Sequence, residues 1–331
     1  MGKRSTAKEV ATMAGVSKWT VIRAFTPGAS ITNDSRDKVL SAARELNYSP
    51  NLLARSLATN LTHQVAVFVD DFTNPHKLPF LEDLTDIMQS EGLAVILVNI
   101  NKQLDHFNAL LNADQRQVDA VVLFGTSFRD ETLRSIKFGS GFPDLYVLAR
   151  DSGLPEVIAV NCDTKQAIGE ICAHLDGRGY RRPAFLSGPK VLSTSLGRYD
   201  AFKDWWKQNR NTNILETDAG NYSYSAGQAM TRDLLSSVSA AKRPDVLMCE
   251  NDILACGAID CIRYEFGLRV PEDIAVVGFD NIEMASYAAY DLTTFEQPRV
   301  EMVRAVTDMI LKKRERKSVD LSGKLVIRGS A

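Results

Sequence analysis

The spacing of apolar residues divides the chain into two parts with different periods. In the first sixty residues, apolar side chains recur every three to four positions, which is typical of short amphipathic helices. After Thr62, short apolar runs alternate with longer amphipathic segments, which is typical of buried strands alternating with helices. The pattern therefore predicts a helical head followed by an α/β body.

The head has the pattern of a helix-turn-helix. A first helix is predicted over residues 8–14 with Thr6 as its N-cap, because a threonine oxygen accepts from the free N–H groups of a first turn. Gly15 tolerates the left-handed conformation of a tight turn, and Ser17 is expected to cap a second helix over residues 18–25.

The second and third helices each have an apolar side. In the second helix, the expected inward residues are Val21, Ala24 and Phe25, and the expected outward residues are Lys18, Trp19, Ile22 and Arg23. In the third helix, predicted over residues 33–46, the expected buried residues are Val39, Leu40, Ala43 and Leu46. A small three-helix bundle with a basic surface would give the same pattern, so the helices alone do not establish DNA binding.

Charge is distributed unevenly along the chain. Residues 1–60 contain nine Lys and Arg and four acidic residues, so they carry a formal charge of +5, whereas the whole chain carries −2. The remainder therefore carries −7. A basic head on an acidic body suggests a polyanion-binding module at the N-terminal end.

Three motifs in the head carry a resemblance to a known family. They are T-x-x-E-V-A-x-x-A-G-V-S-x-x-T-V at residues 6–21, R-x-K-V at residues 36–39 and E-L-N-Y-S-P-N-x-x-A-R-S-L at residues 45–57. The chain resembles the LacI/GalR family of bacterial transcription regulators over essentially its whole length. Residues 50–58 correspond to a helix of about two turns, which is too short to be stable alone in water.

The resemblance implies how the head binds double-stranded DNA. The second helix enters the major groove of a palindromic operator, and residues 50–58 form a hinge helix that folds on DNA and wedges Leu57 into the minor groove. The DNA-binding residues that it implies are Thr6, Ser17, Lys18, Trp19, Thr20, Arg23, Asn51, Ala54, Arg55 and Leu57.

Two residues of the second helix depart from the family pattern. Ile22 stands where the family usually has Ser, so one phosphate hydrogen bond is not expected. Trp19 is a large aromatic residue at a base-contacting position; contact with DNA is expected, and packing on the hinge or a neighbouring helix is the alternative. The operator sequence does not follow from these residues.

The body is predicted to contain parallel sheets. Buried strands are predicted at residues 65–69, 94–98, 120–124, 145–148, 184–186, 246–249 and 274–277, with a last strand at 325–328, and helices are predicted to begin near residues 78, 105, 129, 164, 196, 223, 252 and 299. Strands alternating with helices favour parallel sheets covered on both faces, and about 270 residues exceed one core, which suggests two lobes.

Motifs in the body extend the resemblance to the family's periplasmic-binding-protein-like core. They are N-P at 74–75, S-G-P at 187–189, R-x-x-A-F at 198–202, E-N-D-I-L-A-C-G-A at 250–258, G-L-R-V-P-E-D-I-A-V-V-G-F-D at 267–280 and L-T-T-F-E-Q-P at 292–298. The expected fold class is α/β, with a helix-turn-helix three-helix head and a hinge helix before a two-lobed core of doubly wound parallel sheets. The expected parts are residues 1–49 (DNA-binding domain), 50–61 (hinge helix and linker) and 62–331 (effector-binding and dimerisation core), the last with an N-lobe at about 62–162 and 294–322 and a C-lobe at about 163–293 and 323–331.

Polar residues just past the strands are candidate ligand-binding groups, because open α/β sheets bind ligands at the carboxyl ends of their strands. The resemblance implies that Arg198, Asn251 and Asp280 hold polar groups of an effector, with an aromatic ring near Tyr222 stacked on it. The expected effector-binding residues are Asp71, Phe72, Arg150, Thr194, Arg198, Tyr222, Asn251, Asp280 and Gln297. Asp252 also stands where a helix N-cap is expected.

Two departures in the body change the expected ligand. Ala149 and Arg150 follow a strand after which many relatives have an Asp, and His76 and Lys77 stand where relatives often have two aromatics. These added cationic groups suggest the hypothesis that the effector, a sugar or sugar derivative, carries a carboxylate or phosphate.

Other classes of protein fit the sequence less well. It has no phosphate-binding loop, no G-x-G-x-x-G between a strand and a helix and no nucleophile elbow, so no enzyme, no catalytic residue and no cofactor are expected. The second hypothesis is a solute-binding protein of a transport system, which the missing export signal and the basic head oppose. The third is a sugar-modifying enzyme that uses the carboxylates at the strand ends.

The remaining expectations concern environment and assembly. The five cysteines lack paired CxxC spacing and the four histidines lack metal-ligand spacing, so no metal is expected, and Cys249 and Cys256 are expected in the core. No apolar run approaches the ~18 residues that span a bilayer, which predicts a cytoplasmic protein without membrane contact. The chain ends at Ala331 without the leucine heptad tail of tetrameric relatives, so a homodimer is expected. Whether the effector releases DNA or promotes its binding is open.

Overall fold

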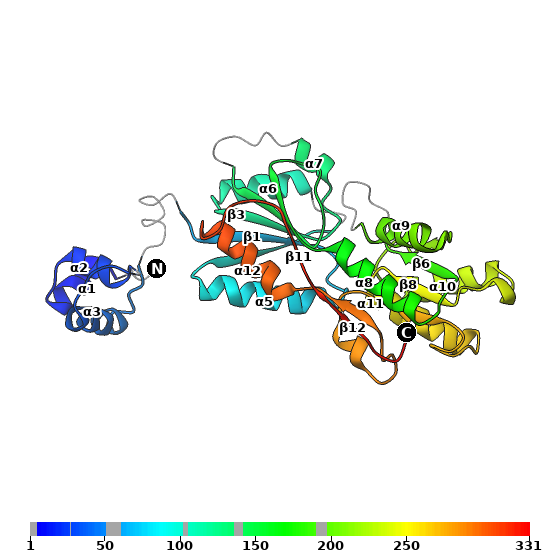
Figure 1. Cartoon of the computed structure of the whole chain (residues 1–331). Helices are drawn as coiled ribbons and strands as arrows, with labels where there is room; N and C mark the ends of the chain where they lie inside the picture. Colours follow the sequence, from blue (N-terminus) through cyan, green and yellow to red (C-terminus); the bar gives the residue numbers. More distant parts are fainter. Residues whose placement is uncertain (1–4, 27, 51–60, 102–104, 136–141, 190–196) are drawn as a thin grey trace. The chain divides into compact units, whose positions relative to one another are not determined.

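The chain divides into two compact units, Met1–Thr62 and His63–Ala331 (Figure 1). We refer to them as the head and the body, and each is described by itself. The computed structural model describes residues 5–26, 28–50, 61–101, 105–135, 142–189 and 197–331. No helix in these ranges is both long enough and apolar enough to cross a membrane.

The described part of the head is helical, and its helices are α1 (Ala7–Ala14), α2 (Lys18–Ala24) and α3 (Asn33–Glu45). At the start of α1, Thr6 Oγ1 accepts from Glu9 N at 3.3 Å, and the Glu9 carboxylate accepts from Thr6 N at 2.7 Å. Gly15 ends α1 in the left-handed conformation with φ +64°, and Ser17 caps α2 by accepting from Thr20 N. The predicted helix-turn-helix and both predicted caps are confirmed.

Small residues from all three helices make the core of the head: Val10, Ala11, Val21, Ala24, Val39, Ala42 and Ala43. The predicted inward side of α2 is confirmed for Val21 and Ala24, and Phe25 is half-buried beside the ring of Tyr48. The predicted buried side of α3 is wrong in part, because Leu40 and Leu46 are only half-buried. Helical spacing from Val39 leads to positions 42 and 43, so the alanines approach the other helices and Leu40 lies to the side.

The N-lobe of the body is a parallel sheet with helices on both faces. Its strand order is β11 (Val319–Leu321), β5 (Val157–Cys162), β4 (Asp144–Leu148), β3 (Ala120–Phe124), β1 (Gln64–Val69) and β2 (Ala94–Asn99). One face packs against α5 (Lys77–Ser90) and α12 (Arg299–Ile310), and the other packs against α6 (His106–Gln115) and α7 (Asp130–Arg134) (Figure 1). Alternate side chains of β1 enter the two cores, as a strand between two helical layers requires.

The C-lobe repeats this architecture on a smaller sheet. Its strand order is β7 (Leu215–Asp218), β6 (Pro183–Ser187), β8 (Val246–Cys249) and β9 (Ala275–Val277). One face packs against α8 (Thr164–Gly177) and α9 (Arg198–Arg210), and the other against α10 (Tyr224–Ser237) and α11 (Asp252–Asp260). The lobe also contains two short 3-10 helices, η2 (Ala240–Lys242) and η4 (Glu283–Ser286), and a π-helical turn, η3 (Cys261–Glu265). β10 (Thr294–Glu296) pairs antiparallel with β12 (Lys324–Val326).

The chain crosses between the lobes at three places in the described body. The crossings follow β5, lie between β10 and α12, and lie between β11 and β12. The seven internal strands and the eight helix starts predicted for the body are confirmed, and all five cysteines are buried. Gln297 lies on the crossing between β10 and α12, and its side chain lies beside His76 of the N-lobe and Asp280 of the C-lobe.

Three predictions about strands need correction. Residues 94–98 form the predicted strand, β2, but this strand is not buried. It lies at the sheet edge with β1 as its single neighbour, and all six of its residues are partly or fully exposed. The last strand ends at Val326 and not at Arg328, because Arg328 N turns aside to donate to Thr293 Oγ1. The strands absent from the prediction are β5, β7, β10 and β11. β7, β10 and β11 are short and contain charged residues, whereas β5 is an apolar run that ends in Asn161 and Cys162.

Candidate effector pocket and DNA-binding surface

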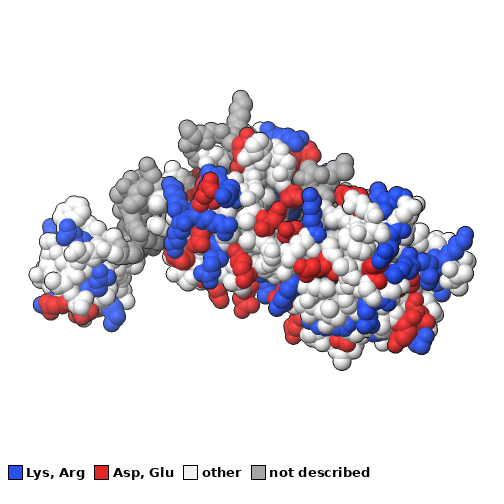
Figure 2. Space-filling model, viewed as in Figure 1, with Lys and Arg blue, Asp and Glu red and all other residues white. Residues whose placement is uncertain are grey.

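The outward side of α2 presents a mixed basic and aromatic surface. Lys18 and Arg23 are exposed, Trp19 is 73% exposed and Ile22 is 43% exposed. Figure 2 shows basic and acidic side chains together on the visible face of the head. Trp19 is not part of the core of the head, so packing inside the described head is not its role. The hydroxyl groups of Ser17 and Thr20 lie 2.9 Å apart at the start of α2. The predicted DNA-binding residues of α1 and α2 therefore lie on exposed or half-buried positions.

Some predicted site residues lie outside the described residues. They are the hinge residues Asn51, Ala54, Arg55 and Leu57 and the effector residue Thr194. The same holds for the hinge helix at residues 51–58. The alternative that Trp19 packs on the hinge lies there too.

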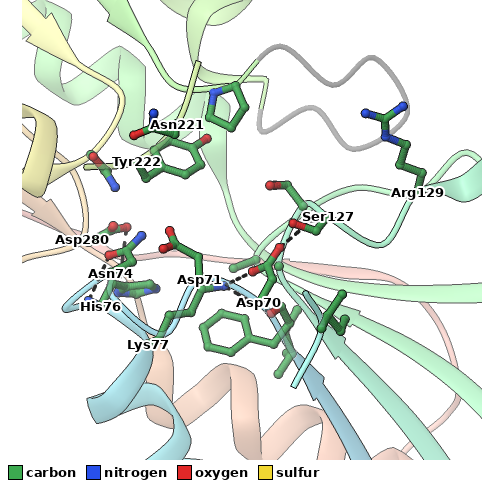
Figure 3. A pocket seen from close by; sticks show the side chains of 18 of the residues that line it. Asp70, Asp71, Asn74, His76, Lys77, Ser127, Arg129, Asn221, Tyr222 and Asp280 are labelled. Atoms are coloured by element: carbon green, nitrogen blue, oxygen red, sulfur yellow. Dashed lines mark hydrogen bonds and ion pairs between the residues drawn. The ribbon is translucent and has the colours of Figure 1, made fainter. Parts of the chain in front are cut away.

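A cavity of about 840 Å³ lies between the lobes of the body, and we refer to it as the interlobe cavity. It opens at the carboxyl ends of β1, β3, β4 and β8, as expected for open α/β sheets. Figure 3 shows the carboxylate of Asp71 directed into the space below the ring of Tyr222. Residues of both lobes line it, among them Asp70, Asp71, Asn74, His76 and Lys77 from the N-lobe and Arg198, Tyr222, Asn251 and Asp280 from the C-lobe.

A buried ion pair forms the N-lobe floor of this cavity. Lys77 Nζ lies 3.2 Å from Asp70 Oδ1, donates to Phe124 O at 3.2 Å and sits 3.9 Å above the centre of the Phe124 ring. Burial alone would raise the pKa of Asp70, but the charge of Lys77 and hydrogen bonds from Ser127 outweigh it and leave that pKa below its usual value. Gly125 makes room for the pair, because a Cβ there, at φ +144°, would lie 1.9 Å from Asp70 Oδ1.

A polar cluster joins the lobes at the back of the cavity. Gln297 Nε2 donates to Asp280 Oδ1 at 2.7 Å and lies 3.4 Å from His76 Nε2. His76 Nδ1 is 4.0 Å from the same Asp280 oxygen, and Arg198 Nη2 is 3.8 Å from it. Burial lowers the pKa of His76 to about 4, with Asp280 opposing this shift and Lys77, Arg198 and Arg299 adding to it. His76 is therefore neutral near pH 7.

The C-lobe wall is an aromatic ring held by a buried acid. Tyr222 Oη donates to Glu250 Oε2 at 3.1 Å, and Gly188 N donates to the same oxygen at 2.5 Å. Burial raises the pKa of Glu250 despite the opposing charge of Arg198. A ring fixed in this way offers one flat apolar surface in a cavity whose other groups are mostly polar.

Gly188→Ala is expected to lower the free energy of unfolding by about 1–3 kcal/mol, the range for overpacking. A Cβ at position 188 would lie 2.0 Å from Cε1 of Tyr222, so the ring must move. Gly169→Ala, in the middle of α8 with open space around its Cβ, is expected to stabilise by about 0.5–1 kcal/mol. Urea unfolding measures both, and equal shifts in the two variants would contradict the contact with Tyr222.

The structure brings together six of the effector-binding residues expected from the sequence. Asp71, Arg198, Tyr222, Asn251, Asp280 and Gln297 all line the interlobe cavity. Burial raises the pKa of Asp71, whose Oδ1 accepts from Thr73 Oγ1 at 2.9 Å. Asn251 is also the N-cap of α11, where its Oδ1 accepts from Leu254 N, so the cap is Asn251 and not Asp252.

Two expected effector residues do not line the cavity. Phe72 packs on the N-lobe core beside the first helical layer. Arg150 is 1% exposed, with Nη1 3.3 Å from Asp130 Oδ1 and Nη2 donating to Phe128 O at 3.0 Å. The expectation for Arg150 is wrong because its position after β4 does not fix the direction of its side chain, and an internal acid holds it.

The hypothesis of an anionic effector loses its supporting groups. Arg150 is paired with Asp130, Lys77 is paired with Asp70, and His76 is neutral. The cavity has residues that the sequence prediction missed: Asn74, Asn101, His106, Thr126, Ser127, Arg129 and Asn221. Asn101, Thr126 and Ser127 closely follow β2 and β3, so the strand-end rule could have found them, whereas Asn221 follows β7, which was not predicted.

A helix-turn-helix head on a two-lobed α/β body with an interlobe cavity defines a DNA-binding transcriptional repressor that responds to a small molecule. A model described as bacterial regulatory proteins of the lacI family matches residues 6–51, and one described as a periplasmic binding protein-like domain matches residues 172–331. The chain belongs to the LacI family of regulatory proteins. It is therefore a regulator and not an enzyme.

Individual relatives agree with this assignment. The chain is 30% identical to the HTH-type transcriptional repressor PurR of Proteus mirabilis (strain HI4320) and 27% identical to the ribose operon repressor of Halalkalibacterium halodurans, covering 98% of this chain and 96% of each relative. The lac repressor dimer bound to operator and the anti-inducer ONPF has the same fold, with a TM-score of 0.81, 23% identity and 99% of each chain covered.

Proposed function

We propose that the protein represses transcription as a cytoplasmic homodimer that binds a palindromic operator and is controlled by a small neutral, hydroxyl-rich effector in the interlobe cavity. The observation that carries this proposal is one chain with two separate surfaces: an outward α2 bearing Lys18, Trp19 and Arg23, and a polar cavity lined by both lobes. The relatives named above include a ribose operon repressor.

On the DNA side, α2 is assigned to the major groove. Lys18, Trp19 and Arg23 are assigned to base edges, and Thr6, Ser17 and Thr20 to the flanking phosphates. A dimer places two such helices on the half-sites of a palindrome. The hinge residues Asn51, Ala54, Arg55 and Leu57 are assigned to the minor groove at its centre, as a family resemblance implies.

On the effector side, the cavity supplies hydrogen-bond acceptors and donors. Its buried cations Lys77 and Arg198 have acids beside them, and Arg129 is an exposed cation of its lining. The carboxylates of Asp71 and Asp280 accept from hydroxyl groups, Arg198 and Asn251 donate, and the Tyr222 ring packs on the face of a sugar; Thr194 and Gln297 complete the assigned set. Because each buried cation already has an acid beside it, a neutral ligand suits the site better than a phosphate. Rotation of the lobes on binding couples the cavity to the head.

Calorimetry with a panel of neutral monosaccharides, including ribose, and their phosphate esters tests the effector class. A neutral sugar is expected to bind, and Asp280→Asn is expected to weaken it at least tenfold because a buried acceptor is lost. Asp204→Asn, on the exposed side of α9, is the matched control with no expected change. Binding of a phosphate ester tenfold tighter than its parent sugar would contradict the neutral effector.

Trp19→Ala is expected to weaken binding to selected operator DNA about tenfold to hundredfold, the loss of one base contact. The unfolding of the head should not change, because Trp19 is 73% exposed and outside the core. Met13→Ala, which removes another exposed apolar side chain of the head, is the control. Equal operator affinity for wild type and Trp19→Ala in a gel-shift titration would exclude Trp19 from the interface.

A further inference from the structure

A second, small cavity lies beside the crossings between the lobes. It has a volume of about 20 Å³ and lies between Arg150, Asn161, Arg198 and Gln297. Ala149, Asp151, Cys162 and Thr164 also line it. Asn161 precedes the first crossing of the chain and Gln297 lies on the second. The small cavity shares Ala149, Arg198 and Gln297 with the interlobe cavity.

Four buried polar atoms of these residues lack a partner among the described residues. They are Arg150 Nε, Asn161 Oδ1, Arg198 Nε and Gln297 Oε1. The four side chains are between 1% and 8% exposed, so bulk water does not reach these atoms freely. Buried polar groups in proteins almost always have a partner, and a bound water supplies it where protein atoms do not.

The other polar atoms of the same side chains already form hydrogen bonds, and these bonds determine which of the four unpartnered atoms are donors and which are acceptors. Asn161 Nδ2 donates to Asp151 Oδ1 at 2.6 Å, and Gln297 Nε2 donates to Asp280 Oδ1 at 2.7 Å. Both amides therefore turn their oxygens, which are acceptors, away from these bonds. Arg150 donates to Asp130 and Phe128 O, and Arg198 donates to Glu250 O, each through its terminal nitrogens. Each guanidinium retains its Nε–H as a donor.

Two donors and two acceptors form the complement of one water molecule, which accepts two hydrogen bonds and donates two. An anion would face the oxygens of Asn161 and Gln297, and a cation would face two guanidinium groups. Each guanidinium also has an acid close by, Asp130 at 3.3 Å from Arg150 and Asp280 at 3.8 Å from Arg198. The site therefore favours a neutral hydroxyl-type group, and about 10–15 Å³ suffices for one water.

We propose that the small cavity is a hydration site, in which one water accepts from the Nε–H groups of Arg150 and Arg198 and donates to Asn161 Oδ1 and Gln297 Oε1. This water bridges the N-lobe residues Arg150 and Asn161 to Arg198 of the C-lobe. It thus lies beside two of the crossings between the lobes, and it touches two residues that line the interlobe cavity. The proposal does not rest on the identity of the effector or on DNA binding.

A crystal structure of the full chain, with and without soaked ribose, tests the site directly. We expect one density peak at about 2.6–3.2 Å from all four atoms in both crystals. If density appeared there only in the soaked crystal, as a hydroxyl group of bound ribose, the cavity would be an effector subsite and the proposal would be overturned. An electron-density map with no peak in the small cavity, in which both Nε–H groups donate to protein atoms, would overturn it too.

Two variants distinguish the contribution of the water to stability from that of the hydrogen bond between Asn161 and Asp151. Asn161→Leu removes an acceptor and fills the small cavity, so the peak should vanish and Tm should fall by about 5 °C. Asp151 also lines the small cavity, but Asp151→Ala retains all four atoms and removes only the side-chain bond to Asn161. The peak should therefore remain and Tm should fall by about 2 °C or less. Equal Tm values for the two variants would contradict a contribution from the water, and the wild-type crystals decide the site even if Asn161→Leu does not fold.

Discussion

Asp70→Ala is expected to lower the free energy of unfolding of the body by about 3–5 kcal/mol, because it leaves the ammonium group of Lys77 buried without its partner. Lys77 is 7% exposed, and it also contacts Phe124 O and the Phe124 ring, while the half-buried Asp71 acts on it only through its charge. Neither contact neutralises a charge. Ser127 N also loses the carboxylate to which it donates at 2.7 Å.

The double variant Asp70→Ala/Lys77→Met tests whether the loss comes from the uncompensated charge. Replacing both charges at once is expected to recover most of the lost stability, since a buried pair replaced by apolar groups is often neutral. Urea unfolding of the wild type, both single variants and the double variant gives the coupling energy, provided that the slope with denaturant stays constant. Additive effects of the two substitutions would contradict a buried ion pair at the cavity floor.

Lowering the pH from 7 to 4 is expected to destabilise the wild type by about 3 kcal/mol more than His76→Phe. The pKa of His76 is about 4 in the folded body, against an ordinary value of 6.5, because burial disfavours the imidazolium. Between these values the unfolded chain binds a proton that the folded chain does not. The contribution is therefore fully present above pH 6.5 and is lost as the pH falls toward 4.

Thermal or urea unfolding of wild type and His76→Phe across this range measures the effect. Phenylalanine fits the site, since His76 already lies edge-on to Phe80 and Phe124 at 5.7 and 6.1 Å. Buried acids such as Glu250 and Asp252 have raised pKa values, but they are present in both proteins and cancel in the comparison. Gly169→Ala, which changes no ionisable group, is the control that should retain the wild-type dependence on pH. Parallel pH profiles for wild type and His76→Phe would contradict a neutral buried His76.

Local sequence signals were sufficient to predict the helices and caps. Thr6, Gly15 and Ser17 act on their own turns, so a side-chain oxygen or a missing Cβ determines the cap without knowledge of the rest of the fold. The strands at the centres of the two sheets could be predicted equally well, because β3 and β8 are continuous apolar runs buried on both faces.

Features that depend on neighbours distant in sequence could not be predicted in this way. The short β11 becomes a strand because it pairs with the end of β5 across more than 150 residues of chain. β5 itself, an apolar run that also pairs with β4, does not depend on such a contact. Position after a strand indicated Asp280 and Arg150 alike, but the direction of Arg150 depends on Asp130, twenty residues earlier. The cationic residues therefore suggested an anionic ligand from the sequence, and their buried acidic partners became visible only in the structure.

The central claim is that the head binds DNA and the body controls it. A salt titration of binding to operator DNA, selected by the intact chain from random duplexes, tests it with two proteins: the intact chain and residues 63–331, which form a compact unit of their own. The intact chain should bind with log K falling linearly against log salt, as phosphate contacts release counterions, and the body alone should not bind. Equal binding by the two proteins, or no salt dependence for the intact chain, would contradict a DNA-binding head.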